Sequence, residues 1–175
     1  MDFPGVLLTG TVGVGKTVLA TDVGAVLAEA GLSPAVIDLD WLGWLDSQNV
    51  SLSDVERLIQ ENLRQVWPNF LARGADHVIL TRMVSDAAQI DAYRSSLEGV
   101  RLSIVRVTAS PDVIDRRLTR RDVGEVLAEH RTGGPRMTKH LDAAEVEDFT
   151  IVNDERPLRQ VTLELLQLLG WRAEH

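Results

Sequence analysis

The chain has 175 residues, of which 45% are hydrophobic and 25% charged, and its net charge is −8. This composition is typical of one globular domain with a continuous core, and the negative charge argues against a dedicated nucleic-acid surface. The lack of cysteine excludes disulfides, thiolate metal sites and cysteine nucleophiles.

Two further features lead us to expect a cytoplasmic protein without a membrane partner. No apolar run approaches the about 18 residues of a membrane span. The first predicted strand begins close to Met1, so we expect no signal or transit peptide before it.

Short apolar strands alternate with amphipathic helices along the chain, which predicts an α/β fold with a parallel sheet covered by helices on both faces. Strands are predicted at Val6–Thr9, Ala35–Asp38, His77–Thr81, Leu102–Val107 and Phe149–Val152. Helices are predicted to begin at Lys16, Ser53, Ser85 or Asp86, Ser110 and about Pro157. The nearly continuous apolar character of the strands is typical of burial on both faces.

Two details of the helices depend on single residues. The helix beginning at Ser53 shows the pattern of a capping box, with Glu56 as its acidic partner. Pro68 is expected to kink or break that helix, because proline lacks a backbone N–H and constrains the residue before it. The Gly-rich segment 131–136 is predicted to be either a solvated loop or the hinge of a lid that spans roughly residues 116–142.

The segment after the first strand matches G-x-x-x-x-G-K-[ST] in full. It reads Gly10-Thr11-Val12-Gly13-Val14-Gly15-Lys16-Thr17. A strand, a Gly-rich turn and a helix start in this order form a phosphate cradle, in which backbone N–H groups point at the phosphates. Lys16 is expected to reach the β- and γ-phosphates, and the Thr17 hydroxyl to join the Mg²⁺ shell. The motif therefore predicts a nucleotide site.

Asp38 and Asp40 follow the second strand. In an extended chain, residues two apart point the same way, so both carboxylates are expected on one side, near the phosphate loop. One would orient metal-bound water, and the other would accept a proton from an attacking hydroxyl. Their positions suggest Asp38 for the metal and Asp40 for the acceptor. The alternative is that both are solvated turn acids.

Three other residues are candidates for the acceptor side. The third strand ends in Thr81-Arg82 without the usual aspartate, which strengthens the case for Asp38 or Asp40. Arg82 is either a ligand for an anionic group of the acceptor or a surface arginine. Trp41 and Trp44, in a predicted loop, either stack on a planar acceptor or fill the space beneath the second helix.

The helix that begins at Ser110 is rich in arginine. It carries Arg116, Arg117, Arg120 and Arg121, with Asp112, Asp115 and Asp122 as potential neutralising partners. Spacings of three and four predict that the arginines lie on roughly one face. Such arginines stabilise charge developing on a γ-phosphate, and the alternative is an exposed helix with salt bridges. The histidines form no metal-ligand spacing and are assigned no chemistry.

With the phosphate loop, the Asp-x-Asp and the arginine-rich helix, the chain resembles the small P-loop kinases. Within this group it is most similar to the branch of adenylylsulfate, shikimate and gluconate kinases. The segment Asp38-Leu39-Asp40 of this chain stands where adenylylsulfate kinases have Asp-Gly-Asp. The resemblance implies a five-stranded parallel sheet in the order 2-3-1-4-5, an Arg-rich mobile lid, ATP and Mg²⁺, and a small hydroxylated acceptor. It also implies that Arg117 and Arg120 or Arg121 act from the base of the lid. Residues Asn153 to Pro157, among them Arg156, would flank the adenine.

The chain departs from adenylylsulfate kinases where Trp41-Leu42-Gly43-Trp44 replaces a segment that contains an arginine, so the acceptor stays open. Two other functions are alternatives. One is a nucleotide-binding protein without catalysis. The other is an ATPase or a GTPase switch. The segment from Asp40 to Gly43 matches the Asp-x-x-Gly motif of such switches, but the chain has no Asn-Lys-x-Asp motif for guanine recognition. The oligomeric state is left open.

Overall fold

The computed structural model, which describes residues 2–45 and 50–171, has one five-stranded sheet in the order β2-β3-β1-β4-β5. The strands are β1 (Phe3–Thr9), β2 (Pro34–Asp38), β3 (His77–Thr81), β4 (Val100–Thr108) and β5 (Phe149–Val152). All neighbouring pairs are parallel. The predicted strand order is confirmed, and β1 and β4 begin a few residues earlier than the sequence suggested.

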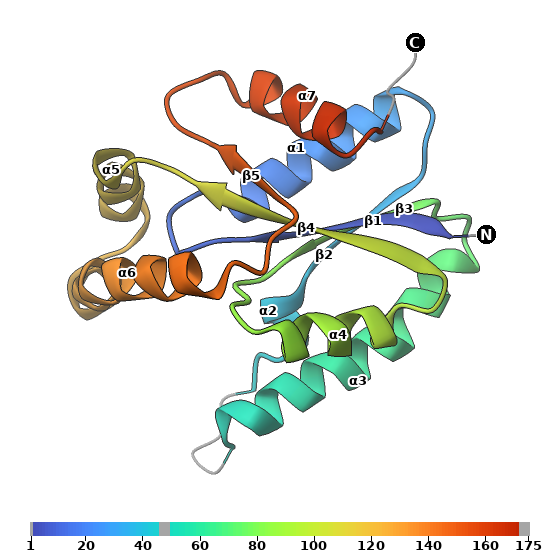
Figure 1. Cartoon of the computed structure of the whole chain (residues 1–175), viewed down its shortest axis with the longest axis horizontal. Coiled ribbons are helices and arrows are strands. Elements are labelled where there is room, and N and C mark those ends of the chain that lie inside the picture. The colour runs from blue at the N-terminus through green and yellow to red at the C-terminus, as the bar shows by residue number, and fades with distance from the viewer. Residues whose placement is uncertain (1, 46–49, 172–175) are drawn as a thin grey trace.

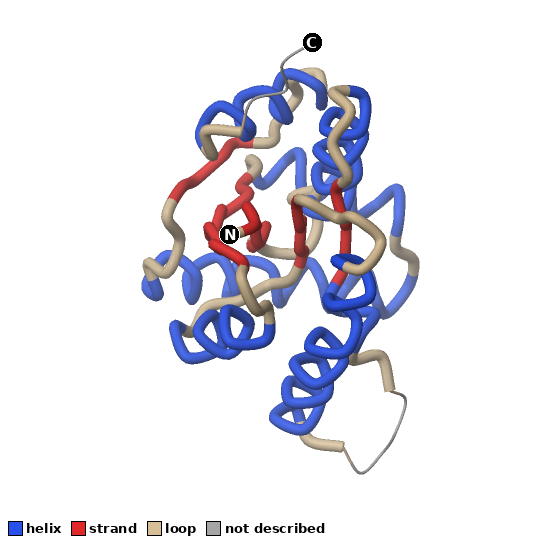
Figure 2. Tube along the Cα trace, turned by 90° about the vertical axis from the view of Figure 1, so that its right-hand side faces the viewer, coloured by secondary structure: helices blue, strands red, loops and turns tan. Residues whose placement is uncertain are grey.

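Helices cover both faces of the sheet (Figure 1). They are α1 (Lys16–Glu29), α2 (Leu39–Leu42), α3 (Leu52–Leu71), α4 (Ala87–Ser96), α5 (Pro111–Arg121), α6 (Gly124–Ala144) and α7 (Leu158–Leu168). Helices α1 and α7 lie on one face, α3 and α4 lie on the other, and α5 and α6 lie beyond the carboxyl end of β4. Figure 2 shows the same two layers from the side. In the described part of the chain, no helix has the length and apolar character needed to cross a membrane.

The central strand β1 supplies both halves of the core. Leu8 belongs to the apolar cluster beneath α1 and α7, whereas Leu7 belongs to the cluster that includes residues of α3 and α4. Both side chains are fully buried. Burial on both faces is the physical reason for the unbroken apolar run that predicted this strand.

Helix α3 differs from the prediction at both ends. Its N-cap is Ser51 rather than Ser53: the Ser51 Oγ accepts from the Asp54 N–H at 3.2 Å, and the Asp54 carboxylate accepts from the Ser51 N–H at 3.3 Å. The predicted capping box was therefore two residues out of register, and Glu56 is free for another contact. Pro68 does not break the helix, because it lies near the C-terminal end, where one missing N–H costs little regular structure.

Helix α6 contains the segment that the sequence indicated as a loop or hinge. Gly133, Gly134 and Pro135 all lie within this helix, so the prediction of a loop is wrong. Contacts with α5 favour the helical form: the Arg131 guanidinium donates two hydrogen bonds to Asp115, at 2.6 and 3.0 Å. A tertiary contact has overridden weak helix propensity here.

Candidate nucleotide and acceptor site

The phosphate loop has the geometry that its glycines permit. Gly10, Gly13 and Gly15 adopt φ values of 141°, 85° and 93°. A Cβ at Gly10 would lie 2.4 Å from the Val107 carbonyl oxygen, and one at Gly15 would lie 2.6 Å from the Asn153 side-chain nitrogen. A side chain at either position would collide with its neighbours, so the close turn around the cradle requires glycine.

Lys16 lies over this loop. Its Nζ donates hydrogen bonds to the carbonyl oxygens of Gly10 and Thr11, at 2.9 and 3.1 Å. Burial lowers the pKa of Lys16 from 10.5 to about 8, while the nearby Asp40 and Asp38 carboxylates partly oppose that shift. A bound phosphate would add negative charge beside Nζ and favour the protonated form.

Thr17 and Asp38 meet at the start of α1. The Thr17 Oγ1 donates to the Asp38 Oδ2 at 3.0 Å, which joins the phosphate motif to the end of β2. A hydroxyl and a carboxylate are hard oxygen ligands, and they fit Mg²⁺, which usually keeps waters and phosphate oxygens as its other ligands. The described ranges contain no cluster of three or more His, Asp or Glu that would hold a metal by protein groups alone.

Asp40 lies in the first turn of α2, so the argument that placed it in an extended chain was wrong. Its backbone N–H donates to the Asp38 Oδ1 at 3.1 Å and begins the short helix. Its Oδ1 accepts a hydrogen bond from the Arg82 Nη1 at 2.6 Å. The two carboxylates are thus close, but they point to different partners: Asp38 to Thr17, and Asp40 to Arg82.

Arg82 is the centre of a network that sequence reasoning did not find. Its Nη2 donates to the Glu56 Oε2 at 2.8 Å, and the Tyr93 hydroxyl donates to the Glu56 Oε1. The side chains of Arg82 and Glu56 are only 17% and 14% exposed, so the interpretation of Arg82 as a surface residue is wrong. Burial and the bond to Glu56 raise the pKa of Tyr93 and keep its phenol protonated. We call Asp40, Glu56, Arg82 and Tyr93 the acceptor-side network.

Glu56 and Tyr93 were missed for different reasons. Glu56 was assigned to the capping box, and correcting the register of α3 removes that role. Tyr93 is the only tyrosine of the chain, and this was the signal that the sequence offered. The structure shows that its side chain is fully buried. Local periodicity could not connect either residue with Arg82, because they come from different helices.

Trp41 and Trp44 do not fill the core. They are 69% and 73% exposed, and they stack on each other with ring centroids 5.2 Å apart and an interplanar angle of 21°. Trp41 belongs to α2 rather than to a loop. The prediction that these rings contact an acceptor therefore stays open to test.

The arginines of α5 line two hollows, and Arg117 belongs to both. Arg117 and Arg121 line a hollow of about 330 Å³ beside the phosphate loop, together with Gly15, Asn153 and Arg156. Arg120 lies at another hollow with Arg116 and Glu155, and Arg117 lines both hollows. Among the α5 arginines, Arg120 thus shares a hollow with Arg116 and Arg117, whereas Arg121 shares one with Arg117 alone. Pro157 is the residue before α7, and Leu158 rather than Pro157 lines the first hollow.

Arg117 and Asn153 hold the phosphate loop through hydrogen bonds to its backbone. The Val14 carbonyl oxygen accepts from the Arg117 Nη1 at 3.1 Å and from the Asn153 Nδ2 at 2.8 Å. Arg117 also donates to the Asp154 carbonyl oxygen at 3.3 Å. These contacts tie the segment after β5 and helix α5 to the same peptide of the loop. In this structure, Arg117 orients the loop rather than reaching over it.

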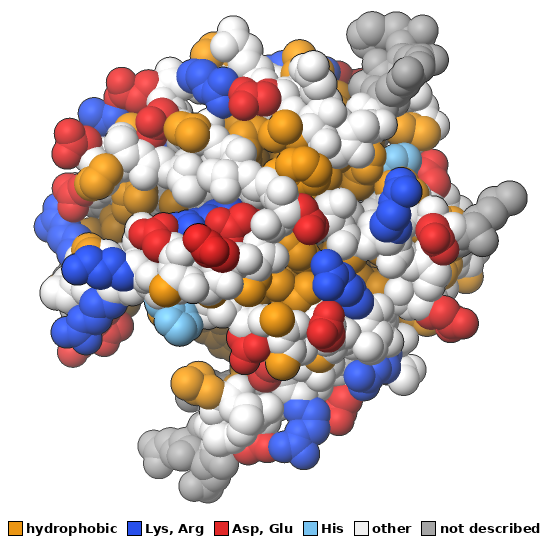
Figure 3. Space-filling view, viewed as in Figure 1, with side chains coloured by type: hydrophobic (Ala, Val, Ile, Leu, Met, Phe, Trp, Pro, Cys, Tyr) orange, Lys and Arg blue, Asp and Glu red, His pale blue; other side chains and the backbone are white. Residues whose placement is uncertain are grey.

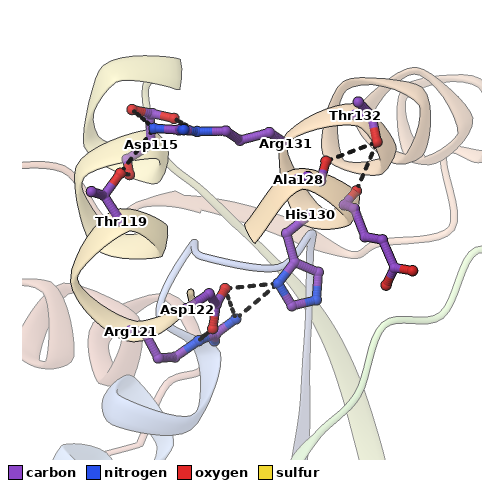
Figure 4. Close-up of polar contacts among 9 residues, drawn as sticks. Asp115, Thr119, Arg121, Asp122, Ala128, His130, Arg131 and Thr132 are labelled. Atoms are coloured by element: carbon purple, nitrogen blue, oxygen red, sulfur yellow. Dashed lines mark hydrogen bonds and ion pairs between the residues drawn. The ribbon is translucent and has the colours of Figure 1, made fainter. Parts of the chain in front are cut away.

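The junction of α5 and α6 carries a set of ion pairs (Figure 4). Asp122 accepts two hydrogen bonds from Arg121, at 2.7 and 3.0 Å, and its Oδ2 lies 2.7 Å from the His130 Nδ1. The bonds from Arg121, and next from His130, lower the pKa of Asp122 to about 2. His130 thus has a structural contact, and Asp122 neutralises Arg121 as expected. Asp115 instead pairs with Arg131, across the junction.

No protein-family profile and no curated protein matches the chain. Solved structures do match, and they define the fold as that of the small P-loop kinases. The APS kinase of Mycobacterium tuberculosis, in complex with AMPPNP and APS, is 24% identical with a TM-score of 0.64, over 97% of this chain and 98% of that one. A shikimate kinase from Bacteroides thetaiotaomicron is 20% identical with a TM-score of 0.66, over 97% and 99%. A gluconokinase from Sinorhizobium meliloti is 20% identical with a TM-score of 0.63, over 97% and 94%.

Proposed function

We propose that the protein is a phosphotransferase that uses MgATP to phosphorylate a hydroxyl group of a small molecule. The observation that carries the proposal is the 3.0 Å bond between Thr17 and Asp38, because it joins the phosphate motif to the strand end that also leads into Asp40. Nucleotide-binding and acceptor-side groups therefore lie around one point. The kinase fold of the solved neighbours supports the same class of reaction.

In this proposal each residue has a distinct task. The loop N–H groups and Lys16 hold the β- and γ-phosphates, and Thr17 and Asp38 hold Mg²⁺, which supplies positive charge to the phosphate oxygens. The acceptor hydroxyl gives its proton to Asp40 while its oxygen bonds to the γ-phosphorus and the bond to the bridging oxygen of ADP breaks. Arg117 and Asn153 keep the loop in place, and Arg121 and Arg156 line the nucleotide hollow. We also propose a cytoplasmic location and no nucleic-acid partner, as the composition indicates.

Thermal unfolding with nucleotides tests the proposal. A ligand at a hundredfold excess over its dissociation constant adds about 2.7 kcal/mol, which corresponds to roughly 5–10 °C for a domain of this size. MgATP should give such a shift for the natural chain and none for Lys16→Ala.

Asp38→Asn should need more Mg²⁺ for the same shift, whereas Asp40→Asn should keep the normal Mg²⁺ dependence. No shift with ATP would contradict the proposal, and a shift with GTP alone would favour the switch alternative. Normal MgATP binding with no transfer to any acceptor would favour the non-catalytic alternative.

A further inference from the structure

We infer that the acceptor is a neutral or cationic polyhydroxyl compound rather than an anion. This inference rests on the proposed phosphotransferase function and narrows its substrate class. It also replaces the expectation that Arg82 binds an anionic group of the acceptor. The inference follows from the partners of Arg82, from the charge of the acceptor-side network and from the two exposed tryptophans.

Arg82 is already bound to two carboxylates. Its Nη1 donates to Asp40 and its Nη2 to Glu56, while its Nε is buried and has no hydrogen-bond partner in the described part of the chain. Because the side chain is only 17% exposed, little of the guanidinium faces outward. An anionic acceptor would have to displace Asp40 or Glu56 and leave a partly buried carboxylate without its ion pair. Such a displacement is unfavourable.

The charge of the network is negative. Asp40 and Glu56 contribute two negative charges against one positive charge of Arg82, and Tyr93 is held in its neutral form. Asp38 lies beside the network and accepts from the Asp40 backbone, but Mg²⁺ would offset its charge, so the net negative charge comes from Asp40, Glu56 and Arg82. The phosphates of a nucleotide would lie beside the same groups. A second anion would meet repulsion here, whereas a hydroxyl or an amine would find acceptors.

Three other cations of the region are already engaged. Lys16 binds the nucleotide phosphates in the proposed function, Arg121 is bound to Asp122, and Arg131 is bound to Asp115. The two ion pairs of Arg121 and Arg131 lie at the junction of α5 and α6 (Figure 4). Basic and acidic side chains are likewise mixed over α5 and α6 on the face shown in Figure 3.

The stacked pair of Trp41 and Trp44 supplies the apolar part of such a site. Trp41 follows Asp40 directly, and both rings are exposed rather than used for packing. Aromatic faces bind cations and the C–H surfaces of ring compounds, and carboxylates bind their hydroxyl or amino groups. Shikimate and gluconate, which appear in the names of two neighbours, are carboxylates. The inferred acceptor class therefore separates this chain from those proteins.

Collisional quenching of tryptophan fluorescence tests the charge of the site without a known acceptor. Caesium, iodide and acrylamide would be compared at constant ionic strength, and the signal of Trp41→Phe/Trp44→Phe would be subtracted. With each quencher normalised to its quenching of free N-acetyltryptophanamide, we expect caesium to quench the stacked pair at least about twofold more efficiently than iodide, because cations concentrate in a negative site. Glu56→Gln should reduce that ratio, whereas Glu61→Gln, which removes the same charge from an exposed position of α3, should leave it unchanged. Equal quenching by the two ions, or an equal effect of both variants, would overturn the inference.

Matched acceptors test the substrate class directly. Release of ADP from ATP would be measured with sorbitol, glucosamine and inositol, and with the anionic hydroxy acids gluconate, glucuronate and shikimate. The uncharged or amino compounds should stimulate ADP release at least about tenfold more than the carboxylates, a difference in transition-state stabilisation of about 1.4 kcal/mol. A preference for the carboxylates, or stimulation by the carboxylates alone, would overturn the inference. Failure of the proposed function would appear instead as loss of the MgATP-dependent thermal shift, or as a normal shift without stimulation by any compound of either set.

Discussion

At the scale of single residues, Lys16 has a property that a binding experiment can detect. In the free protein its Nζ is buried and its pKa is lowered to about 8. Phosphates bound beside Nζ would stabilise the charged form, so nucleotide binding raises this pKa and takes up a proton. At pH 8, where the free side chain is half protonated, uptake should be about half a proton per nucleotide. Calorimetric titration with MgATP in buffers of different ionisation enthalpy measures this number.

The sign of the pH dependence follows from the same shift. Below about pH 7 both free and bound forms carry the proton, so uptake should vanish, and above pH 8 affinity should fall as the pH rises. Lys16→Arg is the control, because an arginine is charged at every pH of the titration. Uptake that persists in Lys16→Arg would assign the proton to another group.

Glu56 provides a second prediction at this scale, for stability. Glu56→Ala leaves the partly buried Arg82 with one carboxylate and Tyr93 without its acceptor, and should lower the free energy of unfolding by about 2–4 kcal/mol. Tyr93→Phe removes only the hydrogen bond and should cost about 1–2 kcal/mol. Glu61→Ala, at an exposed position of the same helix, should stay within about 0.5 kcal/mol of the natural chain. Urea unfolding of the three variants measures these differences, and equal losses for Glu56 and Glu61 would contradict the network.

At the scale of elements, α6 has two glycines in its middle that do not need to be glycine. A Cβ at Gly133 or Gly134 would meet no atom within 4 Å, and neither residue has a positive φ. Gly133→Ala and Gly134→Ala should each stabilise the protein by about 0.5–1 kcal/mol, because alanine loses less conformational freedom in a helix. Chemical denaturation measures the gain.

Gly124 is the matched control in the same helix. It also has no neighbour near its Cβ position, but its φ is +60°. Gly124→Ala should therefore destabilise the protein through backbone strain alone, by about 1 kcal/mol.

The same two variants test whether α6 moves as a lid. If Gly133 and Gly134 allow that motion, Gly133→Ala and Gly134→Ala should show less nucleotide-dependent protection from proteolysis between residues 123 and 139. Protection equal to that of the natural chain would leave α6 as a fixed helix.

The helices show where sequence reasoning succeeds and where it fails. Helix α1 and the phosphate loop were predictable, because local backbone geometry demands glycines at fixed positions. The capping register of α3 was not, because two serines precede the same acidic stretch and the choice between Ser51 and Ser53 depends on hydrogen bonds at the helix start. Helix α6 was missed because Gly133, Gly134 and Pro135 have weak helix propensity. The contact that favours the helix, between Arg131 and Asp115, comes from α5 and is not visible in the local sequence.

At the scale of the whole molecule, the sheet order explains which parts of the site were predictable. Asp38, Arg82 and the phosphate loop end neighbouring strands of a parallel sheet, so their proximity followed from the strand pattern and the resemblance. Glu56 and Tyr93 come from helices on one face of the sheet, and their meeting with Arg82 depends on packing angles that no local pattern encodes. Arg117 was predicted at the site. Its hydrogen bond to the Val14 carbonyl oxygen could not be predicted, because it depends on where α5 packs relative to the phosphate loop.

The two apolar layers on either side of the sheet divide the chemistry between them. The donor groups Lys16 and Thr17 begin α1, above the sheet in Figure 1, whereas Glu56 and Tyr93 belong to α3 and α4 below it. The two clusters of core residues share no member, and only the strands pass between them. During divergence, therefore, the lower layer can exchange residues, and with them the molecule that receives the phosphate, without disturbing the packing that holds the nucleotide. For protein engineering, the natural unit of exchange is the set of helices α2, α3 and α4, with β3 retained because its Ile79 belongs to the cluster beneath α1 and α7.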